Sequence, residues 1–244
     1  QTHPKKQRLK IALCTASPTG SMISPEATQA AKQAADFLAA AGHEIIEIPY
    51  PVDGAALIRS YYQMNGAETT AMMNSIQQGL GRPIRKEEIE PFSWTMHQFG
   101  QKIPAATYVH SLQLWDQAAV TMEELFQKFD LFLSPTTAFS APKINEDLQS
   151  EHIRQRMAQA AELTEAELAE LIYDYFDKSL QLTPYTQLAN LTGQPAISLP
   201  THVTATGLPL GIQLLAARGR EDLLFQVGEQ FEQEGKFKLP ESYR

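Results

Sequence analysis

The sequence is poor in cysteine, and this limits the chemistry that its sites can hold. Cys14 is the only cysteine among 244 residues. An intrachain disulfide and a cysteine-rich zinc site are therefore both excluded. A chain without disulfides fits a reducing compartment, so we expect a cytoplasmic protein.

Long apolar runs and metal-binding patterns are also missing. No stretch reaches the roughly 18 consecutive apolar residues of a membrane-spanning helix, and the N-terminus lacks the apolar segment of a signal peptide. None of the six histidines forms a pair with the spacing of metal ligands. The turn SPTG (17–20) has one glycine and no Gly-Lys-Ser/Thr sequence. We expect no membrane association, no metal and no cofactor.

Positive charge is scarce. The formal net charge is −8 at pH 7, which argues against a nucleic-acid or anionic-membrane partner, since both need clustered Lys and Arg. The one basic cluster lies within residues 5–10, so we interpret residues 1–8 as a linker. The chain starts at QTHPKKQ without Met, which indicates a piece of a longer protein.

What remains is the composition of a globular domain, with 43% hydrophobic and 20% charged residues. The first fifty residues predict a strand over 9–15, a helix, and a second strand over 44–50. Ser24, Pro25 and Gly42 mark the two ends of that helix. Strand, helix and strand in this order predict a parallel βαβ unit.

The middle of the chain predicts helices, and its end predicts strands. We expect a helical subdomain over about 52–128, with helices over 55–78 and 107–129 and a helix start near 84–90 that Pro91 breaks. A buried strand follows at 129–134. A charged helical insertion over about 143–181 carries a capping box from Thr164 to Glu167. Two adjacent strands, AISLP (196–200) and LPLGIQLLAA (208–217), precede a last helix over 221–234.

Two polar segments follow or precede buried strands. SPTTA (134–138) lies at the carboxyl end of a predicted strand, where open α/β sheets bind ligands. TPYTQLANLTGQPAISLP (183–200) predicts a helix start at Thr183, with Pro184 at the first helical position, and then a sharp turn into a strand. For both segments the spacing alone leaves two interpretations open. The polar side chains could line a ligand pocket, or they could only bond nearby backbone groups in a turn or helix cap.

Together these pieces resemble the C-terminal part of the amidase-signature hydrolases, and the likeness covers nearly the whole chain. The stretches that carry it are LKIALCTASPTG, GHEIIEIPYPVDG, LGRPIRKEEIEPFSW and NLTGQPAISLP. They are most similar to the 6-aminohexanoate cyclic dimer hydrolases of that family. The resemblance implies that residues 9–244 form a mixed α/β fold that includes the helical subdomain. It also implies hydrolysis of a small amide by a serine that is activated by a second serine and a lysine.

The residues that would perform this catalysis are not recognisable in the chain. The family places them in a Gly/Ser-rich stretch of its N-terminal half, and this sequence contains no Gly-Gly and no Ser-Ser dipeptide. We therefore assign no catalytic residue, and we expect the chain to be inactive alone and to act with an N-terminal catalytic half. A serine hydroxyl is a weak nucleophile until a base accepts its proton.

The resemblance does imply substrate-binding residues. Thr183 stands seven positions before Asn190, where the amidotransferase branch of the family has an aspartate. Thr136 and Thr137 match a loop near the family's active site. Asn65 and Glu68 lie within 62–71, which matches a helix lining the acyl pocket.

Two other functions stay open. The chain could be a stand-alone binding module derived from the amidase fold, which predicts a reading frame that starts near Gln1. It could also be an unrelated α/β enzyme with Thr136 or Thr137 as nucleophile, although no histidine or lysine has a spacing that supports a base. A surface left open by a missing half predicts homo-oligomers, with contacts around 131–138 and 196–216.

Overall fold

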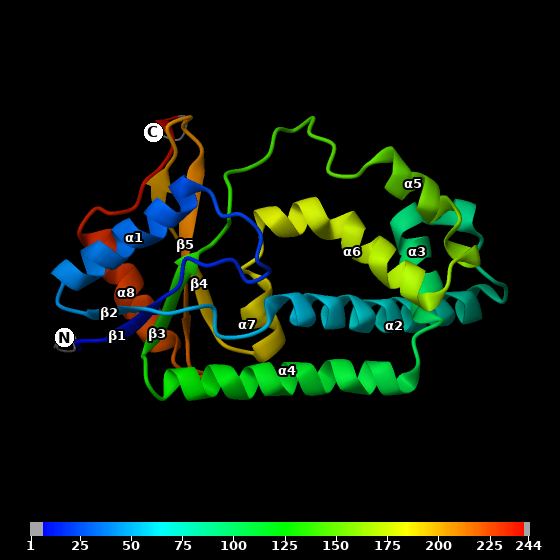
Figure 1. Ribbon diagram of the computed structural model, residues 1–244, viewed down its shortest axis with the longest axis horizontal. Coiled ribbons are helices and arrows are strands. Elements are labelled where there is room, and N and C mark those ends of the chain that lie inside the picture. The colour runs from blue at the N-terminus through cyan, green and yellow to red at the C-terminus, as the bar shows by residue number, and fades with distance from the viewer. Residues whose placement is uncertain (1–6, 242–244) are drawn as a thin grey trace. The chain divides into compact units, whose positions relative to one another are not determined.

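The computed structural model describes residues 7–241 (Figure 1). The linker predicted over 1–8 therefore lies mostly outside the described residues. The chain divides into two compact units, each made from separate stretches of sequence. Unit 1 comprises residues 1–54, 117–143 and 181–244, and unit 2 comprises residues 55–116 and 144–180.

Unit 1 is built on a mixed sheet of five strands, in the order β2-β1-β3-β5-β4. The strands are β1 (Lys10–Leu13), β2 (Glu44–Glu47), β3 (Leu131–Pro135), β4 (Ala196–Val203) and β5 (Pro209–Ala216). β1 pairs in parallel with β2 and β3, and β5 pairs antiparallel with β3 and β4. The predicted parallel βαβ unit and the hairpin of adjacent strands are both confirmed.

Helix α1 (Pro25–Ala40) connects β1 to β2, and its ends are where the sequence predicts them. The Ser24 hydroxyl accepts a hydrogen bond from the Ala27 N–H at 3.1 Å, and Pro25 occupies the first turn. Gly42 follows the helix with a φ of +97°, a backbone conformation that residues with a Cβ rarely adopt. A cap, a proline and a glycine thus set the two ends of α1.

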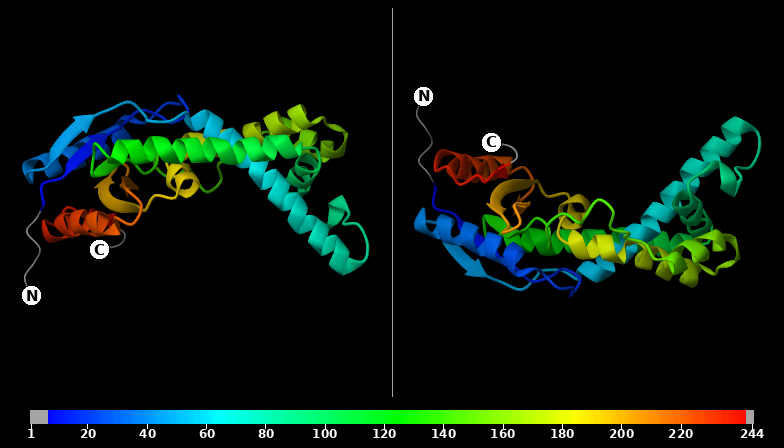
Figure 2. Two further views of the ribbon diagram at one scale, coloured as in Figure 1. Left: turned by 90° about the horizontal axis from the view of Figure 1, so that it is seen from below. Right: turned by 90° about the horizontal axis from the view of Figure 1, so that it is seen from above.

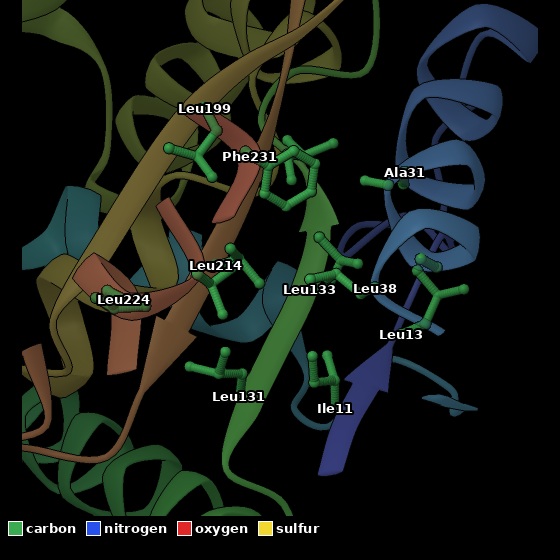
Figure 3. Close-up of a cluster of buried hydrophobic side chains, with 14 of the residues drawn as sticks. Ile11, Leu13, Ala31, Leu38, Leu131, Leu133, Leu199, Leu214, Leu224 and Phe231 are labelled. Carbon is green, nitrogen blue, oxygen red and sulfur yellow. The ribbon is translucent and has the colours of Figure 1, made fainter. Parts of the chain in front are cut away.

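One face of the sheet is covered by α1 and by α8 (Glu221–Gln233). Apolar side chains from both helices and from four strands gather into one buried cluster (Figure 3). The rings of Phe37 and Phe231 join the two helices, with centroids 4.6 Å apart. Each buried Leu or Phe of this cluster contributes about 1.5–3 kcal/mol to stability.

The opposite face of the sheet is buried as well. Phe132 and Leu215 are neighbours across the β3–β5 pair, and neither is more than 1% exposed. The ring of Tyr50 meets Phe132 edge-on, with centroids 6.1 Å apart. Tyr185, itself buried, extends this aromatic layer. β3, with one strand on each side and cover on both faces, is the centre of unit 1.

Unit 2 is built from helices. These are α2 (Gly54–Leu80), η1 (Lys86–Glu88), α3 (Pro91–Gly100), the first half of α4 (Ala105–Phe126), α5 (Glu151–Ala158), η2 (Ala160–Glu162) and α6 (Glu165–Leu182). Their core contains Tyr62 stacked on Phe176, with centroids 4.9 Å apart, and the fully buried Phe99. Figure 2 shows α2 (cyan) diverging from α4 (green) towards the C-terminal end of α2.

Two glycines let α2 and α3 pack closely. A Cβ on Gly100 would lie 1.8 Å from the Gly66 carbonyl oxygen, and a Cβ on Gly66 would lie 2.7 Å from the Phe99 ring. The capping box at the start of α6 is confirmed: the Thr164 N–H donates to Glu167 at 2.8 Å, and the Glu167 N–H donates to the Thr164 hydroxyl at 3.3 Å.

Two predicted helix boundaries are wrong, and proline explains both. Pro91 starts α3 rather than ending a helix, because its fixed φ and missing N–H suit the first helical turn. Thr183 does not start a helix either; α6 ends at Leu182, and four residues separate it from α7 (Gln187–Thr192). A residue before proline is disfavoured in the helical region, so Pro184 interrupts the chain at Thr183.

Candidate functional site

The carboxyl end of β3 brings together two hydroxyl groups from distant parts of the sequence. Thr136 follows β3 directly, and its N–H donates to the Gly211 carbonyl oxygen at 3.0 Å. Its Oγ1 lies 2.8 Å from the Oγ of Ser198 on β4, so one hydroxyl donates to the other. Thr136 is half-buried and Ser198 is exposed, which leaves this pair open on one side.

Gly211 makes room for this hydroxyl pair. It lies on β5 between the two side chains, and a Cβ there would be 2.9 Å from Ser198 Oγ and 3.1 Å from Thr136 Oγ1. Those distances are below ordinary van der Waals contact, so a larger residue would displace one hydroxyl. The sequence prediction missed Ser198 and Gly211. Only the strand register, in which Ser198 faces Gln213, places them beside Thr136.

Thr137 has a local partner. Its hydroxyl donates to the Phe139 carbonyl oxygen at 2.9 Å, which is the turn chemistry that the sequence left open. The next residue fixes the loop: the Ala138 N–H donates to the Leu182 carbonyl at 2.8 Å, and its carbonyl accepts from the Ser24 N–H at 3.0 Å. Three segments of unit 1 therefore hold this loop in place.

Thr183 lies in the bend between α6 and α7. It is half-buried, and its carbonyl oxygen accepts a hydrogen bond from the Gln187 side chain at 2.9 Å. Tyr185 anchors the bend: its hydroxyl donates to the Thr15 carbonyl at 3.3 Å, and Gln213 donates to its backbone carbonyl at 3.4 Å. Burial raises the pKa of the Tyr185 hydroxyl, so this group stays protonated and acts as a donor.

The segment then turns sharply at Gly193. This residue closes α7 in the left-handed conformation, with a φ of +77°. The guanidinium of Arg218 donates two hydrogen bonds to the carbonyl oxygen of Thr192, the last residue of α7. The Gln194 amide, also buried, donates to Glu123 at 3.2 Å. The stretch 183–200 is thus held by hydrogen bonds within unit 1 as it leads from α6 into β4.

Asn65 and Glu68 lie in a different unit from the three threonines. Both are on α2 in unit 2, three residues apart and so on neighbouring positions of one helix face. Asn65 is half-buried and Glu68 is exposed. Their grouping with Thr136, Thr137 and Thr183 in one pocket stays a prediction.

Burial keeps two ionisable groups of unit 1 in their protonated forms. Burial raises the pKa of the Cys14 thiol, so the thiol stays protonated and is a poor nucleophile. Burial also raises the pKa of Tyr50. The hydrogen bond of Thr136 goes to another hydroxyl, and a hydroxyl cannot accept the proton that activation requires.

Among residues 7–241, no group of three or more His, Cys, Asp and Glu side chains is placed to hold a metal ion. No helix within the same range is both long and apolar enough to cross a bilayer.

The comparisons with known proteins agree on one family. The family model called Amidase matches residues 1–225. Lipoamidase of Enterococcus faecalis is 37% identical over 238 residues, which are 96% of this chain and 32% of that protein. The 6-aminohexanoate-cyclic-dimer hydrolase of Paenarthrobacter ureafaciens is 29% identical over 227 residues, which are 92% of this chain and 43% of the hydrolase.

The fold leads to the same group. The solved structure of a 6-aminohexanoate cyclic dimer hydrolase with its substrate superposes with a TM-score of 0.75 at 26% identity, over 98% of this chain and 48% of that one. The chain therefore spans a third to a half of the length of these relatives. Because the family model covers most of its residues and the mixed α/β fold agrees, the chain belongs to the Amidase family.

Proposed function

We propose that this chain is the C-terminal, substrate-pocket-forming part of an amidase that hydrolyses carbon–nitrogen amide bonds. The observation that carries the proposal is the match of almost the whole chain to part of two longer amide hydrolases. In this reaction the amide C–N bond breaks, the acyl carbon gains the oxygen of water, and the amine leaves with a proton.

The division of roles follows from the chemistry of the hydroxyl groups. Thr136 and Ser198 present a donor and acceptors, but they are hydrogen-bonded to each other. Such a pair is suited to hold a polar group of a substrate and is not suited to attack a carbonyl carbon. We assign the nucleophilic serine, its serine partner and its lysine to an N-terminal part, and the substrate contacts to Thr136, Thr137, Thr183, Asn65 and Glu68.

The side chain of Thr183 is proposed to influence which amide substrates the enzyme hydrolyses. A threonine is uncharged, whereas an aspartate at this position would hold an ammonium group by charge. We infer that the enzyme takes amides whose end at this position is neutral. Thr183→Asp in the full-length protein should raise kcat/KM for an amide with an ammonium end relative to a neutral amide of equal length.

The partner proposed for the chain is its own N-terminal half. β4 is one of the two edge strands of the described sheet, so the backbone groups on one of its sides have no partner strand there. Natural proteins cover or blunt such edges. β3, in contrast, is central and buried, so of the two contact regions predicted from sequence only the one that includes β4 offers an open edge.

The experiment compares the 244-residue chain with the full-length protein on a panel of linear and cyclic amides. The chain alone should not hydrolyse any of them, the full-length protein should, and a separately produced N-terminal part should restore activity to the chain. Hydrolysis by the chain alone that survives substitution of its serines and lysines would contradict the proposal.

A substitution then tests the pocket. Thr136→Ala in the full-length protein should change the ratio of kcat/KM between two amides with different acyl groups by about tenfold, because a lost hydrogen bond affects the two transition states unequally. Thr206→Ala, in the exposed β4–β5 turn, is the matched control and should leave the ratio unchanged. A reading frame that starts near Gln1 would favour the stand-alone binding module instead.

A further inference from the structure

Unit 2 contains a cavity that none of the predicted substrate residues lines. Its volume is about 450 Å³, within the range usual for small-molecule sites. It opens between η1, α3, α5 and α6. Its lining residues are Lys86, Glu87, Glu90, Pro91, Trp94, Gln149, Arg154, Met157, Ala158 and Tyr175.

The walls of the cavity are apolar and aromatic. Trp94 from α3, Met157 from α5 and Tyr175 from α6 contribute the large side chains. The Tyr175 ring is stacked on Phe92, with centroids 4.2 Å apart and planes 18° apart, so its orientation is fixed by the core behind it. A rigid aromatic wall gives an apolar ligand body a surface to pack on.

Some of the charged groups around this cavity already form ion pairs, and others do not line up with a single partner of opposite charge. The guanidinium of Arg154 lies 2.7 Å from Asp147 and 3.7 Å from Glu151, so two carboxylates already compensate it. Among the other lining residues, the carboxylates of Glu87 and Glu90 stand against the single ammonium group of Lys86. The lining residues carry two positive and two negative charges in all, so the excess of carboxylate arises because Asp147 and Glu151, which do not line the cavity, pair with Arg154.

We propose that this cavity binds a monovalent organic cation with an apolar body, such as an alkylammonium ion. The apolar chain would pack against Trp94 and Met157, and the ammonium group would lie between the aromatic faces and the carboxylates of Glu87 and Glu90. Trp is the aromatic side chain that attracts cations most strongly. The proposal does not depend on the proposed amidase function, since the cavity lies within unit 2.

The environment of Tyr175 is consistent with this polarity. The pKa of its hydroxyl is raised, first by burial and then by the negative charge of Glu90. Burial disfavours a charge of either sign on this wall, whereas Glu90 disfavours only a second negative charge and attracts a positive one. An anion of the same size should bind more weakly than the cation for the same reason.

Trp94 supplies the experiment with its own reporter, because the chain has only one other tryptophan, Trp115. In a Trp115→Phe variant of the chain, we would follow Trp94 fluorescence during titration with hexylammonium, hexanol and hexanoate. The expected result is saturable binding of hexylammonium, weaker binding of hexanol, weakest binding of hexanoate, and loss of hexylammonium affinity with added salt.

The carboxylates are tested by Glu87→Gln and Glu90→Gln in the same background. Each should weaken hexylammonium binding about fivefold and leave hexanol binding unchanged. Glu162→Gln, which removes an exposed carboxylate that does not line the cavity, is the matched control and should have no effect. Equal or tighter binding of hexanoate, or no saturation by hexylammonium, would overturn the proposal.

A second measurement covers the case in which Trp115→Phe does not fold. The Trp115 indole donates to the Ser60 hydroxyl at 2.8 Å, so its loss removes a hydrogen bond within unit 2. Proton NMR line broadening of the three probes in the presence of the unmodified chain needs no change at this position. The same order of binding, and the same effect of Glu90→Gln, are required there.

Discussion

The imidazole of His43 and the side-chain amide of Gln230 are hydrogen-bonded at 2.9 Å inside unit 1. The other ring nitrogen of His43 accepts from the backbone N–H of Leu9 at 3.0 Å. His43 is therefore the neutral tautomer with its proton on Nε2, which donates to Gln230. One side chain connects the start of β1, the entry to β2 and helix α8.

Replacing the His43 side chain tests how much its two hydrogen bonds contribute to the free energy of unfolding. His43→Leu keeps most of the volume but leaves the buried Leu9 N–H and Gln230 amide without partners, so we expect a loss of about 3 kcal/mol in the free energy of unfolding. Urea unfolding followed by circular dichroism measures it. His152→Leu, at an exposed position of α5, should change stability by less than about 0.5 kcal/mol.

The close approach of α2 and α3 makes a second prediction. Gly100→Ala would place a methyl group 1.8 Å from the Gly66 carbonyl oxygen, so the helices must separate. We expect a loss of about 3 kcal/mol. Gly79→Ala, on α2 in open space, is the matched change and should stabilise the chain by about 0.5–1 kcal/mol. Similar thermal midpoints for the two variants would contradict this packing.

The third prediction concerns pH. His97 is 4% exposed, its Nδ1 has no hydrogen-bond partner among the described residues, and burial lowers its pKa. The unfolded chain therefore binds a proton at a higher pH than the folded chain. Stability is complete above about pH 6.5, the pKa of a free histidine, and falls as pH drops through the interval between the two pKa values.

This loss is limited to about 1.4 kcal/mol per pH unit, since one proton is involved. Denaturant unfolding of the chain between about pH 7 and pH 5 measures the slope, and His97→Gln should make it shallower. His152→Gln removes an exposed histidine and should leave the slope as it is. An unchanged slope in the His97 variant would show that another group titrates.

The fourth prediction concerns the hydroxyl pair. Gly211→Ala adds a Cβ 2.9 Å from Ser198 Oγ and 3.1 Å from Thr136 Oγ1. One of these side chains must rotate away, so the substitution should alter substrate preference in the full-length protein in the same direction as Thr136→Ala. Gly228→Ala is the control, because its Cβ would meet neighbours only at 3.8 Å. Kinetics unchanged by Gly211→Ala would mean that the pair does not contact substrate.

The parts of the fold that depend on interactions between residues close in sequence, such as helix ends, were predictable. Ser24 and Pro25 at one end of α1, or Thr164 and Glu167 at the start of α6, act over one helical turn, and their patterns are visible in the sequence. Pro91 was misread because proline both starts and interrupts helices, and only the packing of α3 decides between the two.

The candidate site was predictable only in part, for a related reason. The sequence points to Thr136 in two ways, through its place after a predicted buried strand and through the resemblance of its loop to one near the family's active site. Ser198 and Gly211 come from two other strands, and their closeness to Thr136 depends on the register of β3, β4 and β5. A one-residue shift in that register would turn both away, and no local signal in the sequence specifies it.

The strand order of unit 1 also has a consequence for how the chain acquires its structure during synthesis. β3 must pair with β1, from which all of α2, α3 and α4 separate it, and with β5, which is translated after α6. Contacts so distant in sequence form slowly. The sheet therefore cannot close until β5 has been synthesised, and until then the faces of β1, α1 and β3 that pack on β5 and α8 in the folded chain lack these two elements.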